Sequence, residues 1–269
     1  MDFEESISFV TKSLQTVIEL PTTSRLHTLG SKGNQPKWCL NNKWYKADYL
    51  GYEGFSEAVC STLLKHSNID SYIPYRSVLI SEGKRVFRGC VSNDFGTLLS
   101  GESILLVLPE EYNVFINTAP TLEANVEIFC KGVEKIFGVD IRSKFVSMLM
   151  FDFLVGNEDR ILRNFGLIEQ NSKYYFAPLF DNGLSLLADT SSNERLHSFE
   201  EILFKPFNTT YTETFSYLRS QEPLTLDAVA IFSDIQSIPY YEDCMIGVYN
   251  LLMKSLETHK GVLWRDTKL

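Results

Sequence analysis

The chain has 269 residues and a formal net charge of −9, with 44% hydrophobic and 22% charged residues. This is the composition of an ordinary globular protein, which excludes collagen-like, low-complexity and disordered chains. The length suits one large domain or two lobes that share a cleft. The acidic total disfavours nucleic acid or an anionic membrane surface as a direct partner.

The five cysteines are scattered and odd in number, with no CxxC pair, and the first residues, MDFEESISFV, are acidic. This start lacks the basic residues and long apolar run of a secretory signal. The apolar runs of the chain are too short to span a bilayer. We therefore expect reduced cysteines and a cytoplasmic protein without a membrane span, and signal-less secretion as an effector stays open.

The first elements alternate between helical and strand-like patterns. Residues 3–20 have apolar positions near helical spacing, which predicts a helix that ends at Pro21. Segments 36–40 and 43–49 then flank an Asn-Asn pair, and this pattern is typical of a β-hairpin.

A helix and a second hairpin are expected next. Residues 54–66 return to helical periodicity, with Ser56 as the expected N-cap. Residues 71–80 and 85–92 are rich in β-branched side chains and flank the turn at 82–84, which predicts an antiparallel pair.

The rest of the chain is expected to be mostly helical. Residues 125–137 form an amphipathic pattern, whereas 141–156 are apolar nearly all round, which indicates a buried central helix. Two apolar runs within 165–180 predict a further hairpin. Later helices are expected at 196–204, 209–220, 225–235 and 239–258.

This order predicts an α+β chain with two lobes. A small lobe with an antiparallel sheet would span residues 1–93, and a larger helical lobe would span 94–269. No Gly/Ser/Pro-rich linker separates them, which favours two lobes packed around a shared cleft.

The densest polar cluster in apolar sequence is GNEDRILRNFG at residues 156–166. Asp159 and Asn164 have the D-x-x-x-x-N spacing of phosphoryl-transfer loops, in which the carboxylate orients a hydroxyl and the amide oxygen ligates Mg²⁺. The same residues also suit a plain solvated loop after a helix. Taken alone, the spacing arises often by accident.

A second carboxylate follows the predicted hairpin at 165–180. Asp181 ends an apolar run and begins an Asp-Asn-Gly sequence, which is also a good turn. Its place after the D-x-x-x-x-N loop is that of a metal-binding Asp, and Mg²⁺ takes hard oxygen ligands. Asn164 and Asp181 are therefore the candidate metal ligands.

The candidate phosphate-binding residues lie in the small lobe. Lys46 stands in a predicted strand and Glu57 in the helix after it, as in a lysine–glutamate pair that steadies nucleotide phosphates, although Lys46 alone also suits a surface lysine. Gly30 and Gly33 lie in a loop before the first hairpin, where backbone N–H groups could approach phosphate. Each feature alone is weak, but their order is that of a protein-kinase-like ATP site.

At this point the chain resembles the HipA-like serine/threonine kinases of bacterial toxin–antitoxin systems. The resemblance covers residues 25–190 and rests on three segments: GSKGNQPKW (30–38), FLVGNEDRILRNFG (153–166) and PLFDNGLSLL (178–187). It implies a bilobal kinase fold, ATP and Mg²⁺ as cofactors, transfer to Ser/Thr of a protein including autophosphorylation, and an antitoxin or regulatory protein as a further partner.

The resemblance also implies a role for each matching residue. Asp159 would be the catalytic base, Asn164 and Asp181 would bind Mg²⁺, and Lys46, paired with Glu57, would contact the ATP phosphates. Adenine would bond to backbone near Cys90–Ser92. The nucleotide-side residues implied in this way are Gly30, Ser31, Gly33, Gln35, Cys90 and Val91.

The chain departs from the family in two respects. Ile161 stands where family members often have His, and there is no room for the extra N-terminal subdomain of full-length HipA proteins. Ser31 does not align cleanly with the loop serine that is autophosphorylated in the family. The motifs are also similar to those of phosphatidylinositol 4-kinases, so a lipid kinase and a pseudokinase or nucleotide-binding module remain alternatives.

Overall fold

The computed structural model describes residues 17–26, 35–112, 119–191 and 196–267. Its strands are β1 (Val17–Glu19), β2 (Arg25–Leu26), β3 (Lys37–Leu40), β4 (Lys43–Ala47), β5 (Tyr75–Glu82), β6 (Arg85–Asn93), β7 (Leu98–Ser100), β8 (Gly166–Gln170), β9 (Lys173–Phe176), β10 (Leu224–Leu226) and β11 (Trp264–Asp266). Its helices are α2 (Glu53–Lys65), α3 (Gly101–Val107), α5 (Leu122–Phe137), α6 (Arg142–Val155), α7 (Tyr211–Leu218), α8 (Ala228–Ile235) and α9 (Glu242–His259), with 3₁₀ turns η1 (Thr22–Ser24) and η2 (Phe199–Glu201).

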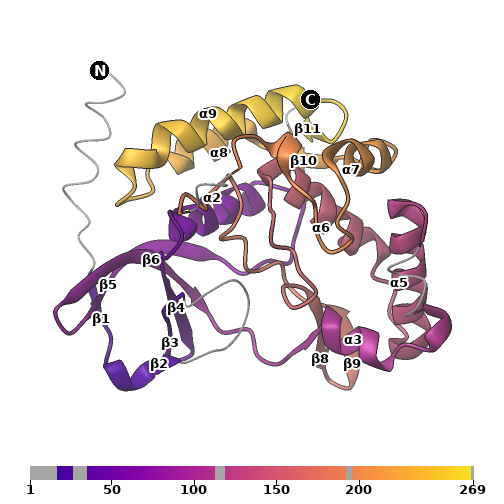
Figure 1. Cartoon of the computed structure of the whole chain (residues 1–269), viewed down its shortest axis with the longest axis horizontal. Helices are drawn as coiled ribbons and strands as arrows, with labels where there is room; N and C mark the ends of the chain where they lie inside the picture. Colours follow the sequence, from indigo (N-terminus) through magenta and orange to yellow (C-terminus); the bar gives the residue numbers. More distant parts are fainter. Residues whose placement is uncertain (1–16, 27–34, 113–118, 192–195, 268–269) are drawn as a thin grey trace.

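A curled six-stranded sheet in the order β1-β5-β6-β4-β3-β2 forms one side of the molecule, and helices form the other (Figure 1). Both hairpins predicted in this sheet are present, and so is the third, predicted within 165–180. Asn41 and Asn42 have positive φ angles of 52° and 56°, as a tight hairpin turn requires, and Lys37 stands directly opposite Lys46 across it. The sheet has a small core of its own around Trp38.

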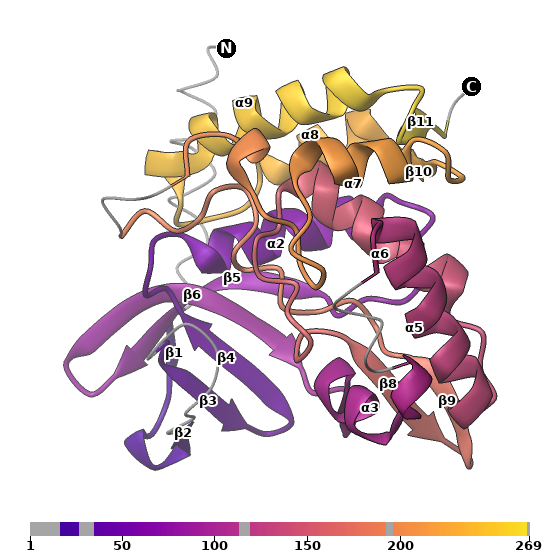
Figure 2. The same cartoon turned by 45° about the vertical axis from the view of Figure 1, so that its right-hand side comes forward.

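Helix α2 joins the sheet to the helical layer. Phe55, Val59 and Leu63 on this helix are buried in the same large core as α5, α6 and α9. Figures 1 and 2 show α8 and α9 lying over α2, on the side away from the sheet. The apolar face of α2 therefore lies in the large core, although the sequence order places this helix in the small lobe.

Helix α6 is the central helix, as predicted. Every residue from Met148 to Val155 is buried. Gly156 ends the helix with a left-handed φ of 61°, and its backbone is so close to Phe199 that a Cβ there would lie 2.4 Å from the ring. This end of α6 leads directly into the polar segment 156–166.

Four of the predicted elements are wrong in part. Residues 17–19 are strand β1, not the end of a helix, because they pair in parallel with β5; the rest of the predicted helix 3–20 lies almost wholly outside the described residues. Ser56 does not cap α2, since the helix begins at Glu53. The predicted helix 225–235 begins too early, because its first two residues belong to β10 and the Asp227 side chain caps α8 after them. The segment 196–204 contains no α-helix, only η2.

The predicted boundary after residue 93 lies between β6 and β7, and it stays a prediction. Strand β7 pairs with β8 of the helical part, which agrees with a change of layer here, but α2 shares its core with the later helices. In the part of the chain that the structure describes, no helix is long and apolar enough to cross a membrane.

Candidate active site

One pocket collects polar side chains from both parts of the fold. It lies between β3 and β4, the start of α2, the loop after α6 and the segment after β9. Its lining residues are Gln35, Lys37, Lys46, Tyr49, Leu50, Glu53, Glu57, Cys90, Asp159, Asp181, Gly183 and Leu184. Residues that are far apart in the sequence therefore meet at one place.

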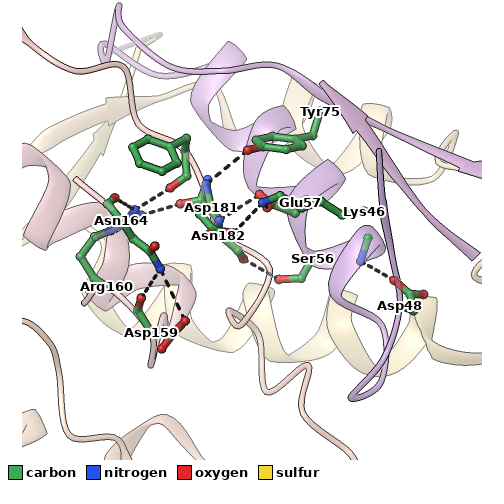
Figure 3. A network of polar contacts seen from close by, with 12 residues as sticks. Lys46, Asp48, Ser56, Glu57, Tyr75, Asp159, Arg160, Asn164, Asp181 and Asn182 are labelled. Carbon is green, nitrogen blue, oxygen red and sulfur yellow. Dashed lines mark hydrogen bonds and ion pairs between the residues drawn. The ribbon is translucent and has the colours of Figure 1, made fainter. Parts of the chain in front are cut away.

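Lys46 is the link between the two sides of this pocket. Its ammonium Nζ lies 2.9 Å from Glu57 Oε1 and 2.6 Å from Asp181 Oδ1 (Figure 3). Burial by itself lowers the pKa of Lys46, but the two carboxylates outweigh it and raise that pKa well above its ordinary value. Lys46 is therefore a fixed positive charge at the centre of the site.

Asp181 is held in an unusual backbone conformation next to this lysine. Its φ is 57°, in the left-handed region, and the Tyr75 hydroxyl lies 3.4 Å from its backbone nitrogen. Burial raises the pKa of its carboxyl group, yet Lys46 and Lys37 overcome this and lower the pKa to about 2. Asp181 is ionised at neutral pH, as a metal ligand must be.

Glu57 connects α2 to the same segment. Its second oxygen, Oε2, accepts a hydrogen bond of 2.9 Å from the backbone N–H of Asn182. The side chain is buried, and burial raises its pKa although Lys46 acts in the opposite direction. Glu57 therefore fixes both Lys46 and the backbone next to Asp181.

The loop after α6 brings Asp159 and Asn164 together. The Asn164 Nδ2 donates to the backbone oxygen of Asp159 at 2.8 Å and lies 3.5 Å from its carboxylate Oδ2. Asn157 Oδ1 accepts from the Asp159 backbone N–H at 3.0 Å, which fixes the start of the loop. Asp159 is half-buried and lines the pocket.

A fully buried arginine ties this loop to the segment of Asp181. Arg160 is 0% exposed and forms an ion pair with Asp152 of α6 at 2.8 Å. Its NH1 donates to the backbone oxygens of Asn164 at 2.8 Å and Phe180 at 2.6 Å, and its NH2 donates to Asn182 Oδ1 at 2.6 Å (Figure 3). One guanidinium therefore brings the two predicted metal ligands to neighbouring positions.

The donor set fits a magnesium ion. Asn164 offers an amide oxygen and Asp181 a carboxylate, which are the hard donors that Mg²⁺ combines with phosphate oxygens. The amide nitrogen of Asn164 is the end that faces Asp159, so its oxygen is at the opposite end. Among the described residues no group of three or more His, Cys, Asp and Glu could hold a metal. Asn164 and Asp181 together offer the amide oxygen and the carboxylate that the sequence predicted as metal ligands.

The structure brings most of the predicted site residues together. Gln35, Lys46, Glu57, Cys90, Asp159 and Asp181 line the pocket, and Asn164 is hydrogen-bonded to Asp159. Gly30, Ser31 and Gly33 lie outside the described residues. Val91 does not line the pocket, because its side chain packs in the core of the sheet with Trp38 and Tyr45.

The backbone at Cys90–Ser92 is committed to the sheet. Strand β6 lies between β4 and β5, and Val91 stands opposite Tyr45 on one side and Arg76 on the other. Ladder hydrogen bonds on both sides leave no free edge for an adenine ring. The connection 94–97 between β6 and β7 follows the end of the sheet.

An aromatic pair lies beside this connection. The rings of Phe95, from the connection, and Phe180, just before Asp181, are 5.0 Å apart, and Ile73, Tyr75 and Cys90 complete the cluster. Cys90 belongs both to this cluster and to the pocket lining, so the apolar cluster adjoins the site.

Sequence reasoning missed Lys37, Asp152 and Asn182 at this site. Two of them carried a signal. Lys37 and Lys46 are equidistant from the Asn41-Asn42 turn, so the predicted hairpin already placed them side by side. Asp152 is the only charged residue in the apolar run 145–155, which indicates a buried partner. Nothing in the sequence marked Asn182 as the acceptor for Arg160.

The fold is similar to that of a solved kinase, which agrees with the kinase fold that the sequence motifs predicted. The chain matches the solved structure of the Helicobacter pylori proinflammatory kinase CtkA with a TM-score of 0.60 over 90% of this chain and 95% of that chain, at 15% sequence identity. A second match, with a TM-score of 0.45 and 14% identity over 96% of this chain and 71% of the other, is to HipA from Shewanella oneidensis MR-1, solved with HipB and operator DNA. No family model and no curated protein matches the sequence.

Proposed function

We propose that the protein is an ATP- and Mg²⁺-dependent kinase that transfers the γ-phosphate to a Ser or Thr hydroxyl of a protein, including its own chain. The observation that carries the proposal is the Lys46 ammonium between Glu57 and Asp181, at 2.9 and 2.6 Å. A kinase needs such a lysine, held by a helical glutamate, next to its metal-binding aspartate.

Each residue has a role that follows from its chemistry. Lys46 and Lys37 would neutralise the phosphate oxygens, and Asn164 and Asp181 would hold the metal. Bound Mg²⁺ would withdraw charge from the phosphate oxygens in the transition state. Asp159 would orient the acceptor hydroxyl and take its proton as the new P–O bond forms and ADP leaves. Catalysis would rest mainly on positioning and charge neutralisation.

The fold supports this proposal, because the match at a TM-score of 0.60 is a kinase. The adenine ring would lie against the aromatic pair Phe95 and Phe180, with its backbone contacts at 94–97. A regulatory protein partner, such as an antitoxin, and a cytoplasmic location stay predictions from the sequence.

The direct test is the intact mass of the protein after incubation with Mg-ATP, together with phosphate transfer to a generic protein. We expect Asp159→Ala to lower turnover by about 10²–10⁴-fold. Asp181→Ala should abolish Mg²⁺-dependent transfer. Asp70→Ala is the matched control, because the Asp70 side chain is 85% exposed and lies outside the pocket. Full activity in Asp181→Ala would contradict the site assignment.

Two further readouts separate the alternatives. Calorimetric binding of Mg-ATP without phosphate transfer would identify a nucleotide-binding module. Transfer to phosphoinositide vesicles but not to protein would identify a lipid kinase. Mapping the phosphorylated residue tests directly whether Ser31 is an acceptor.

A further inference from the structure

The segment after Asp181 contains a strained turn that the proposed chemistry does not use. Leu186 and Leu187 have φ angles of 58° and 57°, both in the left-handed region. A side chain with a Cβ disfavours this conformation, and a single leucine there is already an outlier. Two successive leucines in this conformation persist only where the surroundings hold them.

Tyr52, the residue before α2, holds this turn. Its hydroxyl lies 2.8 Å from the backbone oxygen of Leu186 and 3.0 Å from that of Leu187, and the two carbonyls share its single proton. The Tyr52 backbone N–H also donates to the Ala188 oxygen at 3.3 Å. Gly51 packs so closely here that a Cβ would lie 2.0 Å from the Ala188 oxygen. The loop before α2 and the strained turn therefore fit against each other without a gap.

The other side of the turn is bonded to the loop that carries Asp159. The Leu184 carbonyl accepts from the Glu158 backbone N–H at 3.2 Å, and the Leu186 N–H donates to the Val155 oxygen at 2.8 Å. Glu158 is the residue directly before Asp159. The shape of the turn therefore sets the position of the loop that carries the catalytic carboxylate.

We propose that Tyr52 is a positioning residue: its hydroxyl keeps the Leu186–Leu187 turn in the left-handed conformation, and the turn in turn fixes the loop of Asp159. This rests on the proposed kinase function. Asp181 is anchored independently by Lys46 and by the bond from Asn182 to Glu57. Loss of the hydroxyl should therefore disturb Asp159 and leave the nucleotide-binding groups in place.

The first test is the Tyr52→Phe variant, which removes only the hydroxyl. We expect kcat to fall by about 10–100-fold, because a small displacement of a reacting group has an effect of this size. The KM for ATP should stay within about threefold, on the same reasoning. Tyr217→Phe is the matched control, since the buried Tyr217 hydroxyl has no hydrogen-bond partner among the described residues.

The second test relieves the strain in another way. Leu187→Gly removes the cost of the left-handed conformation, because glycine adopts it freely. In the double variant Tyr52→Phe, Leu187→Gly the turn no longer needs the hydroxyl. The kcat of the double variant should therefore return to within about threefold of the kcat of Leu187→Gly alone. A merely structural role would lower the unfolding midpoint, leave kcat per folded molecule unchanged and give no rescue.

Hydrogen exchange at the Leu186 amide tests the same proposal without any activity. This amide should exchange about tenfold faster in Tyr52→Phe, as local opening becomes easier, and should slow again in the double variant. If the wild-type protein transfers no phosphate, the proposed function fails and this readout still decides the role of Tyr52. Unchanged exchange, a kcat within twofold of Tyr217→Phe, or no rescue would each overturn the proposal.

Discussion

Arg160 connects the loop of Asp159 to the segment of Asp181. Its side chain is completely buried, and a buried charge is costly unless its donors all find acceptors. Here the guanidinium meets the Asp152 carboxylate, two backbone carbonyls and the Asn182 amide oxygen. Through these bonds, Arg160 holds α6, the loop of Asp159 and the segment of Asp181 together.

We expect Asp152→Asn to lower the free energy of unfolding by about 3–5 kcal/mol, because it leaves the guanidinium buried without a counter-charge. Urea denaturation of the variant and the wild type measures this loss. The control is Glu102→Gln, which removes the partner of Arg163 in a pair that is about half exposed at both ends. The control should unfold at nearly the wild-type urea concentration. Equal losses in both variants would contradict the special role of the buried pair.

At this scale the sequence predicted the residue types but not how they are held. The motif spacing and the order of the residues were enough to select Lys46, Glu57, Asp159 and Asp181, which line one pocket, and Asn164, which is hydrogen-bonded to Asp159. The hydrogen bonds of Arg160 could not be foreseen, because three of its four acceptors belong to the backbone or to a residue 22 positions away.

Helix α2 is fixed at both ends by the C-terminal helices. At its start, Asp48 accepts hydrogen bonds from the Gly54 N–H at 2.7 Å and from the Tyr241 hydroxyl at 2.8 Å. At its other end, Asp234 of α8 lies 2.7 Å from Lys65 and 2.8 Å from the His66 ring. The element that carries Glu57 therefore cannot turn away from Lys46 without breaking contacts to α8 and α9.

The contact at the start of α2 should be sensitive to pH. Burial raises the pKa of Asp48 from 3.8 to about 6, although the bonds from Gly54 and Tyr241 act to lower it. A folded-state pKa above the unfolded one means that the folded protein binds the proton more tightly. The contribution of protonated Asp48 to the free energy of unfolding is therefore complete below pH 4 and is lost as the pH rises through 6.

Asp48→Asn is neutral at every pH and should lack this dependence. The difference in unfolding free energy, variant minus wild type, should increase by up to about 3 kcal/mol between pH 4 and pH 8, at about 1.4 kcal/mol per pKa unit. Urea denaturation at pH 4, 6 and 8 gives this difference. Asp70→Asn, at an exposed carboxylate, is the control for the substitution itself. A flat profile for Asp48→Asn would show that its pKa is not raised.

Whether an element could be predicted depended on where its partners lie in the chain. The hairpins at Asn41-Asn42 and at 82–84, and helix α6, follow from local pattern, because turn chemistry and apolar periodicity are local signals. Strands β1 and β10 were expected to be helical, since each forms only by parallel pairing with a strand dozens of residues away. Such pairing is a tertiary effect that overrides the local pattern.

Helix α2 connects the sheet to the large helical core. The sheet has its own cluster around Trp38, but α2 packs on β5 and also contributes Phe55, Val59 and Leu63 to the large helical core. Phe55 stacks on Tyr241 of the C-terminal part with the ring centroids 5.0 Å apart. The residues that line the pocket are therefore held by contacts to the sheet and to the helical part together.

Because α2 packs on both the sheet and the helical core, we expect a single cooperative unfolding transition. Chains longer than about 150 residues commonly unfold in steps instead. Of the three tryptophans, Trp38 lies in the sheet and Trp264 in the helical core. In the Trp44→Phe, Trp264→Phe variant, fluorescence reports the sheet through Trp38, while far-ultraviolet circular dichroism reports mainly the helices. The two urea curves should coincide, and so should those of Trp38→Phe, Trp44→Phe, which retains Trp264. A Trp38 signal lost at lower urea than the helical signal would mean that the sheet unfolds by itself and that α2 does not couple the two parts.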